Sequence, residues 1–209
     1  PWSAPEGGIR LSGRTLAMSL LFGQCPAGET RAALAALAGC PAELGLSYPC
    51  NAGWRYQALA RSGVVQPILD DFRRRWATMR SVTENGTIQE DWQAPTDGGA
   101  QWSHCAAAPL FVTYMDLAGI RPLEPGFRRC RIRPQLGDLK DLKLTAHTVR
   151  GPIKFDAQAE GTGHRVSISL PPACAGELVL PDGSVRKVEA RAEAFIPDRK
   201  STRLNSSHT

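Results

Sequence analysis

Two carboxylates and a tryptophan stand side by side at Glu90-Asp91-Trp92, and Ser103-His104 follows after a short loop. A tryptophan face can stack on a sugar ring. A partly desolvated carboxylate beside it can act as a general base, because its pKa rises toward the working pH. Asp91 alternates out of phase with Glu90 and Trp92 and is expected to point elsewhere. These residue types predict a sugar-processing site, whereas a loop glutamate taken alone is usually just solvated.

The Ser103-His104 pair has a functional and a structural interpretation. In a sugar site, His104 donates to a hydroxyl or orients Glu90. As a structural residue it caps the helix that follows, for which Ser103 is a suitable N-cap. Neighbours in sequence rarely reach each other in catalytic geometry, so the two are not a nucleophile–base pair.

Three other tryptophans bear on sugar binding. Trp54 and Trp102 lie near the ends of predicted helices and are candidates for stacking on a sugar ring. Trp76 falls in a helical apolar pattern and is assigned to the core. Asn85-Gly86-Thr87 matches a glycosylation acceptor, but Asn-Gly is also a strong turn signal, and we interpret the segment as a turn.

The first part of the chain has the composition and periodicity of helical hairpins joined by loops that contain Gly and Pro. Thr30 is expected to cap the second helix, and Tyr48–Asn51 to form a loop. In the fourth helix Asp70, Asp71 and Arg73–Arg75 fall largely on the faces away from the apolar one, and the arginine run is interpreted as a solvated face rather than an anion site. Helices are predicted at Arg14–Phe22, Thr30–Leu37, Gly53–Arg61, Pro67–Met79 and Ala106–Leu117.

Beyond Pro122 the pattern changes to that of strands. A linker rich in Pro and Gly is expected up to Gly137, and short period-two runs follow it. Asp182-Gly183 and Gly161–Gly163 are predicted turns. The runs, which predict an antiparallel β-module of the sandwich type, are Leu142–Val149, Ile153–Ala157, Arg165–Leu170 and Glu177–Leu180.

Composition and charge exclude several classes of protein. A hydrophobic content of 42% is typical of a folded globular protein, and no apolar run is long enough to predict a membrane-spanning helix. Residues 199–209 resemble a translated sequencing adapter, and we treat them as a non-native tail. The formal net charge of +5 falls to +2 without the three basic residues of that tail, which is too little to predict a nucleic-acid partner. No signal-peptide pattern is present, and the sequence predicts no compartment.

The six cysteines form no Cys-x-x-Cys pair, and the chain has no phosphate-binding glycine loop and no His-Glu-x-x-His motif. No metal or other cofactor is therefore predicted. Cys25, Cys40 and Cys105 stand among alanines and leucines, where a thiol behaves as a small apolar residue. We expect reduced cysteines in the core rather than a disulfide framework.

Several motifs, taken in order, resemble a known family. The segment Gly86–Trp92 resembles the Thr-x-x-Glu-x-Trp segment of bacterial α-L-rhamnosidases of glycoside hydrolase family 78. Gln89 stands where that family has an aromatic residue, and Cys105 replaces a polar or aromatic neighbour. The other matching segments are Ser103-His104, Ala108-Pro109, Leu117–Pro122, Gly126-Phe127, Ile132–Pro134 and Thr148–Ile153.

This resemblance implies an α+β multidomain fold, in which residues 1–136 hold the last helices of an (α/α)6 barrel and residues 137–198 form a β-sandwich. It also implies inverting hydrolysis of a rhamnoside, with Glu90 as the general base and with Trp92 and His104 lining the sugar site. Trp54 is a further candidate for sugar binding. The family's general acid lies far upstream, and no matching segment precedes Glu90, so we expect a C-terminal fragment that is inactive alone.

Three other functions remain open on the sequence. The chain can be a non-catalytic carbohydrate-binding module that uses Trp54, Trp92 and Trp102 as stacking platforms. It can also belong to a six-hairpin glycosidase with another sugar specificity. A purely structural domain is the third alternative, and it predicts that Glu90 and His104 lie apart or face away from any cleft.

Overall fold

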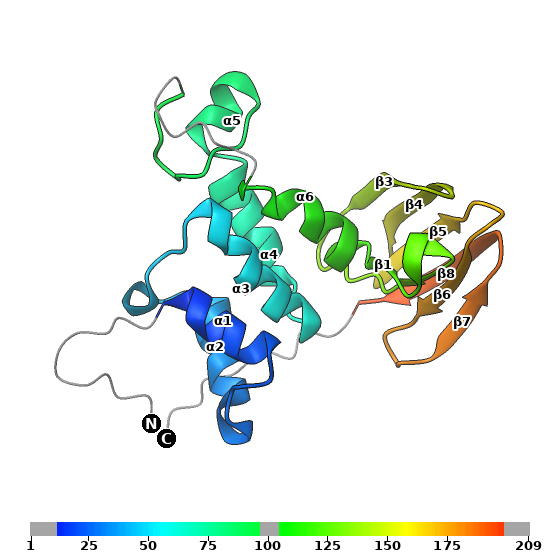
Figure 1. The fold of residues 1–209 in the computed structure, drawn as a ribbon, viewed down its shortest axis with the longest axis horizontal. Coiled ribbons are helices and arrows are strands. Elements are labelled where there is room, and N and C mark those ends of the chain that lie inside the picture. Colours follow the sequence, from blue (N-terminus) through cyan, green and yellow to red (C-terminus); the bar gives the residue numbers. More distant parts are fainter. Residues whose placement is uncertain (1–11, 97–104, 199–209) are drawn as a thin grey trace. The chain divides into compact units, whose positions relative to one another are not determined.

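The computed structural model describes residues 12–96 and 105–198, and the chain divides into two compact units between Val112 and Thr113 (Figure 1). Helices make up the regular structure of the first unit, and β-strands dominate the second. The predicted α+β class is confirmed. The finer assignment of residues 1–136 to a barrel and of residues 137–198 to a sandwich domain stays a prediction.

The first unit is built on three packed helices, α1, α2 and α3 (Figure 1). Small buried side chains, among them Ala33 and Ala52, let these helices approach closely, and Leu37, Tyr56 and Leu59 fill the space between the elements. The elements of this unit are α1 (Gly13–Leu21), η1 (Ala27–Glu29), α2 (Thr30–Gly39), η2 (Ala42–Leu44), α3 (Pro49–Arg61), α4 (Gln66–Asp71), η3 (Phe72–Trp76), α5 (Arg80–Asn85) and α6 (Ala108–Val112).

Helix ends follow the local sequence, and they correct two predictions. The predicted loop at Tyr48–Asn51 is wrong, because α3 begins at Pro49, and proline suits a first helical position. Thr30 is not the cap of α2; the N-cap residue is Glu29, whose side chain makes no capping hydrogen bond. Gly23 follows α1 with a φ of 68°, as expected for a glycine just past a helix end.

The predicted helix from Pro67 to Met79 changes its winding partway. It begins as α4 and continues as the π-helix η3, in which the Ala77 amide donates to the Phe72 carbonyl five residues earlier at 2.9 Å. Trp76 is 4% exposed, so its assignment to the core is confirmed. A short unpredicted helix, α5, follows and ends at Gly86, which has a φ of 69°; the predicted turn at Asn85–Thr87 is therefore the end of this helix.

The second unit contains two four-stranded sheets that share one core. One sheet has the strand order β1-β2-β6-β7, and the other, which is antiparallel throughout, has the order β3-β4-β5-β8. The elements are η5 (Thr113–Leu117), β1 (Ile120–Pro122), η6 (Pro125–Phe127), β2 (Arg129–Ile132), β3 (Asp141–Thr148), β4 (Gly151–Glu160), β5 (Gly163–Ser169), β6 (Ala175–Val179), β7 (Val185–Val188) and β8 (Arg191–Pro197).

Alternation of side chains explains why these segments are strands. Val166 and Ile168 on β5 are buried, while Ser167 and Ser169 between and beside them are partly exposed. The two predicted turns are confirmed: Gly161 joins β4 to β5, and Asp182-Gly183 joins the antiparallel pair β6 and β7. Ser184 donates to the Asp182 carboxylate from its amide at 2.9 Å, which fixes the second turn.

The expected linker between Pro122 and Gly137 is wrong, because it contains β2, a strand of the first sheet. Cys130 and Ile132 on β2 are both 0% exposed, whereas Arg129 and Arg131 face outward, which is the alternation of a half-buried strand. β2 pairs with β6 in parallel, so the β-module is not purely antiparallel. The last strand, β8, was also not predicted.

Candidate active site

The backbone before Glu90 is held by its neighbour Gln89. The Gln89 side chain is 3% exposed, and its Nε2 donates to the Thr96 carbonyl at 3.2 Å. The Gln89 amide also contacts the Met79 sulfur at 3.4 Å. These two contacts tie Gln89 to Met79, just before α5, and to Thr96. Glu90 therefore follows directly after an anchored residue.

The Glu90 carboxylate is half-buried and faces a thiol. Cys105 Sγ lies 3.5 Å from Glu90 Oε2, with the thiol as the donor. Desolvation raises the pKa of the Cys105 thiol, and the hydrogen bond to Glu90 raises this pKa further. Cys105 therefore stays protonated at neutral pH, and its S–H is available as a donor to the Glu90 carboxylate. The expectation that Cys105 lies in the core is wrong, because its side chain is exposed.

Trp92 is fixed by one hydrogen bond and one ring contact. Its indole Nε1 donates to the Ser47 carbonyl at 2.8 Å. Its ring meets Trp76 edge to face, with the ring centroids 4.9 Å apart and an interplanar angle of 73°. Asp91 serves the local turn, since its Oδ1 accepts a hydrogen bond from the Gln93 amide at 3.1 Å.

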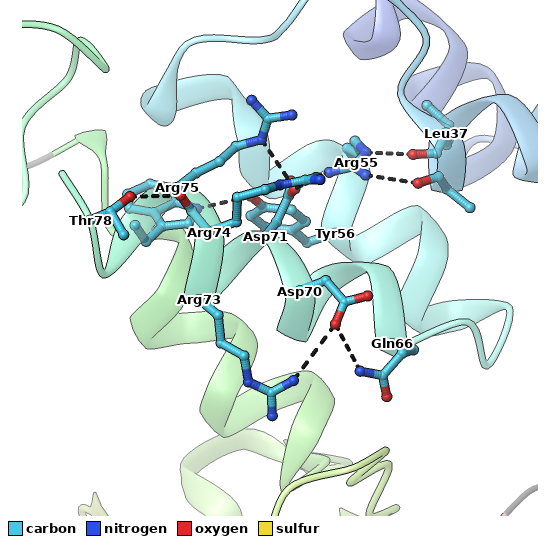
Figure 2. A network of polar contacts seen from close by, with 12 residues as sticks. Leu37, Arg55, Tyr56, Gln66, Asp70, Asp71, Arg73, Arg74, Arg75 and Thr78 are labelled. Atoms are coloured by element: carbon cyan, nitrogen blue, oxygen red, sulfur yellow. Dashed lines mark hydrogen bonds and ion pairs between the residues drawn. The ribbon is translucent and has the colours of Figure 1, made fainter.

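A buried polar network continues inward from Trp76. Trp76 Nε1 donates to the Tyr56 hydroxyl at 2.9 Å, and that hydroxyl donates to Asp71 Oδ2 at 3.2 Å. Arg55 forms an ion pair with the same Oδ2, and its Nη2 donates to the Ala38 carbonyl at the end of α2 at 3.3 Å (Figure 2). The network thus links α2, α3 and the α4–η3 segment to the ring on which Trp92 rests.

Asp71 is the centre of this network, which corrects the expectation of a solvated charged run. Its side chain is 1% exposed, and Oδ1 accepts from Arg74 Nη2 and Arg75 Nε, both at 3.1 Å (Figure 2). Burial raises the pKa of the Asp71 carboxyl, but the charge of Arg55 and the hydrogen bonds from Arg74 and Arg75 outweigh it. The net pKa lies below the ordinary value of 3.8.

A narrow pocket is lined by Trp92 together with Arg55, Tyr56, Asp71 and Ser47, among other residues. Its free volume of about 10 Å³ admits the centre of about one water molecule. A monosaccharide does not fit, and Glu90 is not among the residues that line the pocket. It is a packing gap, not a sugar-binding site.

The structure brings together only some of the predicted site residues. Glu90 and Trp92 share one short loop, and Trp54 projects from α3 with 37% of its surface exposed. His104, Ser103 and Trp102 lie outside the described residues. The contributions of Ser47, Asp71 and Cys105 were missed, because each depends on a contact between distant parts of the chain.

Two kinds of feature are absent from the described part of the chain. Within residues 12–96 and 105–198, no helix has the length and apolar character needed to cross a membrane. The same residues contain no cluster of three or more His, Cys, Asp and Glu side chains placed to hold a metal ion.

Several solved structures share this fold. The α-L-rhamnosidase of Aspergillus terreus matches with a TM-score of 0.73 and 18% identity, over 88% of this chain and 24% of that one. The family 78 rhamnosidase of Bacillus sp. GL1 matches with a TM-score of 0.72 and 21% identity, over 84% of this chain and 20% of that one. The chain therefore spans about a quarter or less of the length of these enzymes.

A third structure was solved with a sugar bound. The α-L-rhamnosidase of Streptomyces avermitilis, complexed with L-rhamnose, matches with a TM-score of 0.63 and 18% identity, over 89% of this chain and 21% of that one. No curated protein sequence matches the chain. Residues 119–195 match the sequence model of the bacterial alpha-L-rhamnosidase C-terminal domain. Residues 119–195 thus resemble the C-terminal domain of bacterial α-L-rhamnosidases, and the chain as a whole shares its fold with part of the solved rhamnosidases.

Proposed function

We propose that this chain belongs to a glycoside hydrolase of the α-L-rhamnosidase type, in which Glu90 is the general base of an inverting reaction. The observation that carries this proposal is the placement of Glu90 two residues from an anchored tryptophan. The half-buried carboxylate beside a fixed aromatic ring has the chemistry that such a reaction needs.

In this reaction Glu90 removes a proton from a water molecule, which attacks the anomeric carbon from the face opposite the leaving oxygen. A second carboxylic acid protonates the leaving oxygen. In inverting glycosidases the two carboxyl groups stand about 6.5–9.5 Å apart, which leaves room for the water. Asp91 does not fit this second role, because its carboxylate is engaged by the Gln93 amide. The acid is expected from the remainder of a longer protein, since the matched rhamnosidases are about four times as long as this chain.

Trp92, His104 and Trp54 are the residues proposed to bind the sugar. Part of the Trp92 ring is covered by Trp76, so any sugar contact uses the remaining exposed surface of the ring. Trp54 offers an exposed ring on α3. The L-rhamnose bound in the Streptomyces avermitilis enzyme supports rhamnose as the sugar to test first.

The test uses a protein that carries this chain joined to the rest of a family 78 catalytic domain. We expect hydrolysis of 4-nitrophenyl α-L-rhamnopyranoside, with β-L-rhamnose as the first product seen by proton NMR. The 209-residue chain alone is expected to be inactive on the same substrate. Release of α-L-rhamnose as the first product would contradict the inverting mechanism. Faster hydrolysis of another aryl glycoside would show that rhamnose is not the preferred sugar.

A carbohydrate-binding module is the second candidate, and the exposure of Trp54 favours it. This alternative predicts that the isolated chain binds L-rhamnose, that Glu90→Gln leaves the affinity unchanged and that Trp54→Ala removes binding. Titration by isothermal calorimetry distinguishes the two candidates. If the chain is part of a hydrolase, the isolated chain is not expected to bind the sugar. The Glu90→Gln variant should then bind sugar without turnover only when the rest of the catalytic domain is present.

A further inference from the structure

Two thiols lie against each other in the core of the second unit. Cys130 Sγ on β2 and Cys174 Sγ, just before β6, are 3.6 Å apart. The side chains are 0% and 3% exposed, and the two residues are 44 positions apart in sequence. Neither thiol takes part in the proposed reaction, so their contact calls for a separate explanation.

The backbone holds these two residues in place. β2 and β6 are parallel neighbours in register, with Cys130 opposite Gly176. The Cys174 amide donates to the Pro171 carbonyl at 3.0 Å, and the Ala175 amide donates to the Arg128 carbonyl at 3.0 Å. Because both strands are fixed by these bonds, the sulfur contact is a property of the sheet and does not depend on a mobile side chain.

We propose that Cys130 and Cys174 are a site of disulfide formation, which a small-molecule disulfide such as glutathione disulfide can oxidise. A disulfide bond is about 2.05 Å long, so the sulfurs must approach by about 1.5 Å, a shift within reach of side-chain rotation about the Cα–Cβ bonds. In the first step a Cys174 thiolate attacks the oxidant and releases one glutathione thiolate. The Cys130 thiolate then attacks the mixed disulfide and releases the second. The two protons lost by the protein thiols are taken up by the two glutathione molecules.

Access to the pair is provided by the short β5–β6 connection. Pro172 and Ala173, directly before Cys174, are exposed. Opening of this turn presents Cys174 without unfolding the sheets. Burial, and then the hydrogen bond from Cys174, raises the pKa of Cys130 to about 12. Oxidation of the folded chain is therefore slow at neutral pH and faster as the pH rises, because only the thiolate attacks.

The bond is expected to stabilise the second unit. It would close a loop of 44 residues that includes β3, β4 and β5. Closing a loop of this length restricts the unfolded chain, and we expect the Tm of the unit to rise by roughly 10 °C.

The experiment treats the 209-residue chain with glutathione disulfide at pH 8.5, blocks the remaining thiols with N-ethylmaleimide in denaturant and maps tryptic peptides by mass spectrometry. The expected product is the dipeptide Cys130-Arg131 linked to the peptide Val166–Arg186, with a reducible rise in Tm. Recovery of both cysteines fully blocked, or each bound only to glutathione, would overturn the proposal.

Cys174→Ala and Cys105→Ala are the matched variants. The first is expected to remove the linked peptide and the Tm rise, whereas the second, at an exposed thiol, is expected to keep both. A Tm rise that survives in Cys174→Ala would contradict the proposal. If Cys174→Ala fails to fold, the peptide map of the unaltered chain still decides the question, because it identifies the linked residues directly.

Discussion

Trp92 is joined to Ser47 by a hydrogen bond from its indole Nε1 to the backbone carbonyl, across 45 residues of sequence. This bond attaches the Glu90 segment to the connection between α2 and α3. From the other side, Trp76 contacts the Trp92 ring and continues into the buried network of Tyr56 and Asp71. The position of the proposed base therefore depends on the packing of the whole first unit.

Replacement of Trp92 by Phe tests the value of this bond. The ring contact with Trp76 is largely kept, but the Ser47 carbonyl loses its donor. We expect a loss of about 1 kcal/mol in the unfolding free energy of the first unit, measured by urea denaturation. Trp54→Phe, at an exposed position, is the control and is expected to change stability by less than about 0.5 kcal/mol. Equal effects in the two variants would show that the Ser47 bond contributes nothing.

Asp71→Asn tests the centre of the buried network. The change leaves the Arg55 guanidinium buried without its counter-charge, and removal of one partner of such a pair costs about 3–5 kcal/mol. Asp70→Asn is the matched control, because Asp70 is exposed and its ion pair with Arg73 is 3.6 Å long. The control is expected to cost less than about 1 kcal/mol in urea denaturation.

The ionisation of the Asp71 carboxylate is expected to make the unfolding free energy depend on pH, and the direction of this dependence follows from its pKa. Because the pKa of Asp71 in the folded protein lies below its ordinary value of 3.8, its charge adds stability at pH values above that ordinary value. This contribution falls as the pH drops from about 4 through the lower folded pKa. We expect the difference in unfolding free energy between the unaltered chain and Asp71→Asn to shrink over this range. A difference that stays constant down to pH 2 would contradict the assigned ion pair.

The contact between Glu90 and Cys105 can be tested without enzyme activity. Glu90→Gln removes the negative charge that faces the thiol, so the pKa of Cys105 is expected to fall toward its ordinary value. The pH dependence of Cys105 alkylation by iodoacetamide, followed by peptide mass spectrometry, measures this pKa. Asp91→Asn is the control and is expected to leave the profile unchanged. Identical profiles for Glu90→Gln and the unaltered chain would rule out the contact.

In the second unit, position 119 requires glycine for two reasons: its backbone conformation is left-handed, and there is no room for a side chain. Its φ is 73°, and a Cβ atom there would lie 2.0 Å from the Arg133 carbonyl oxygen. We expect Gly119→Ala to cost more than about 2 kcal/mol in urea denaturation. Gly183 has a φ of 87° but nothing within 4 Å of its added Cβ, so Gly183→Ala isolates the backbone strain and is expected to cost about 1 kcal/mol. Equal losses would show that the Arg133 contact does not matter.

Local sequence patterns predicted those elements whose burial follows a regular period. Val166 and Ile168 alternate with serines along one strand, and the structure buries them as expected. Cys130 and Ile132 alternate with arginines in the same way, but the surrounding prolines favoured a linker. The parallel pairing of β2 with β6 joins segments more than 40 residues apart, and no local pattern carries that information.

The candidate site was only partly predictable for a related reason. Glu90 and Trp92 stood out by residue type and by family resemblance. Asp71 was misplaced because the π-helix at Phe72–Trp76 changes the helical phase beside it. The partners that fix the site are distant in sequence: Ser47 is 45 residues from Trp92 and Cys105 is 15 residues from Glu90, so no local pattern pairs them.

The central claim, that Glu90 is a general base, is tested most directly by Glu90→Ala in the protein that joins this chain to the rest of its catalytic domain. We expect kcat for 4-nitrophenyl α-L-rhamnopyranoside to fall by about 10²- to 10⁴-fold. Added azide, a nucleophile that needs no deprotonation, should restore release of nitrophenol and form a β-rhamnosyl azide. Asp91→Asn should retain most of the activity. Turnover of Glu90→Ala within about threefold of the unaltered enzyme would contradict the claim, since general-base catalysis contributes at least about 10²-fold.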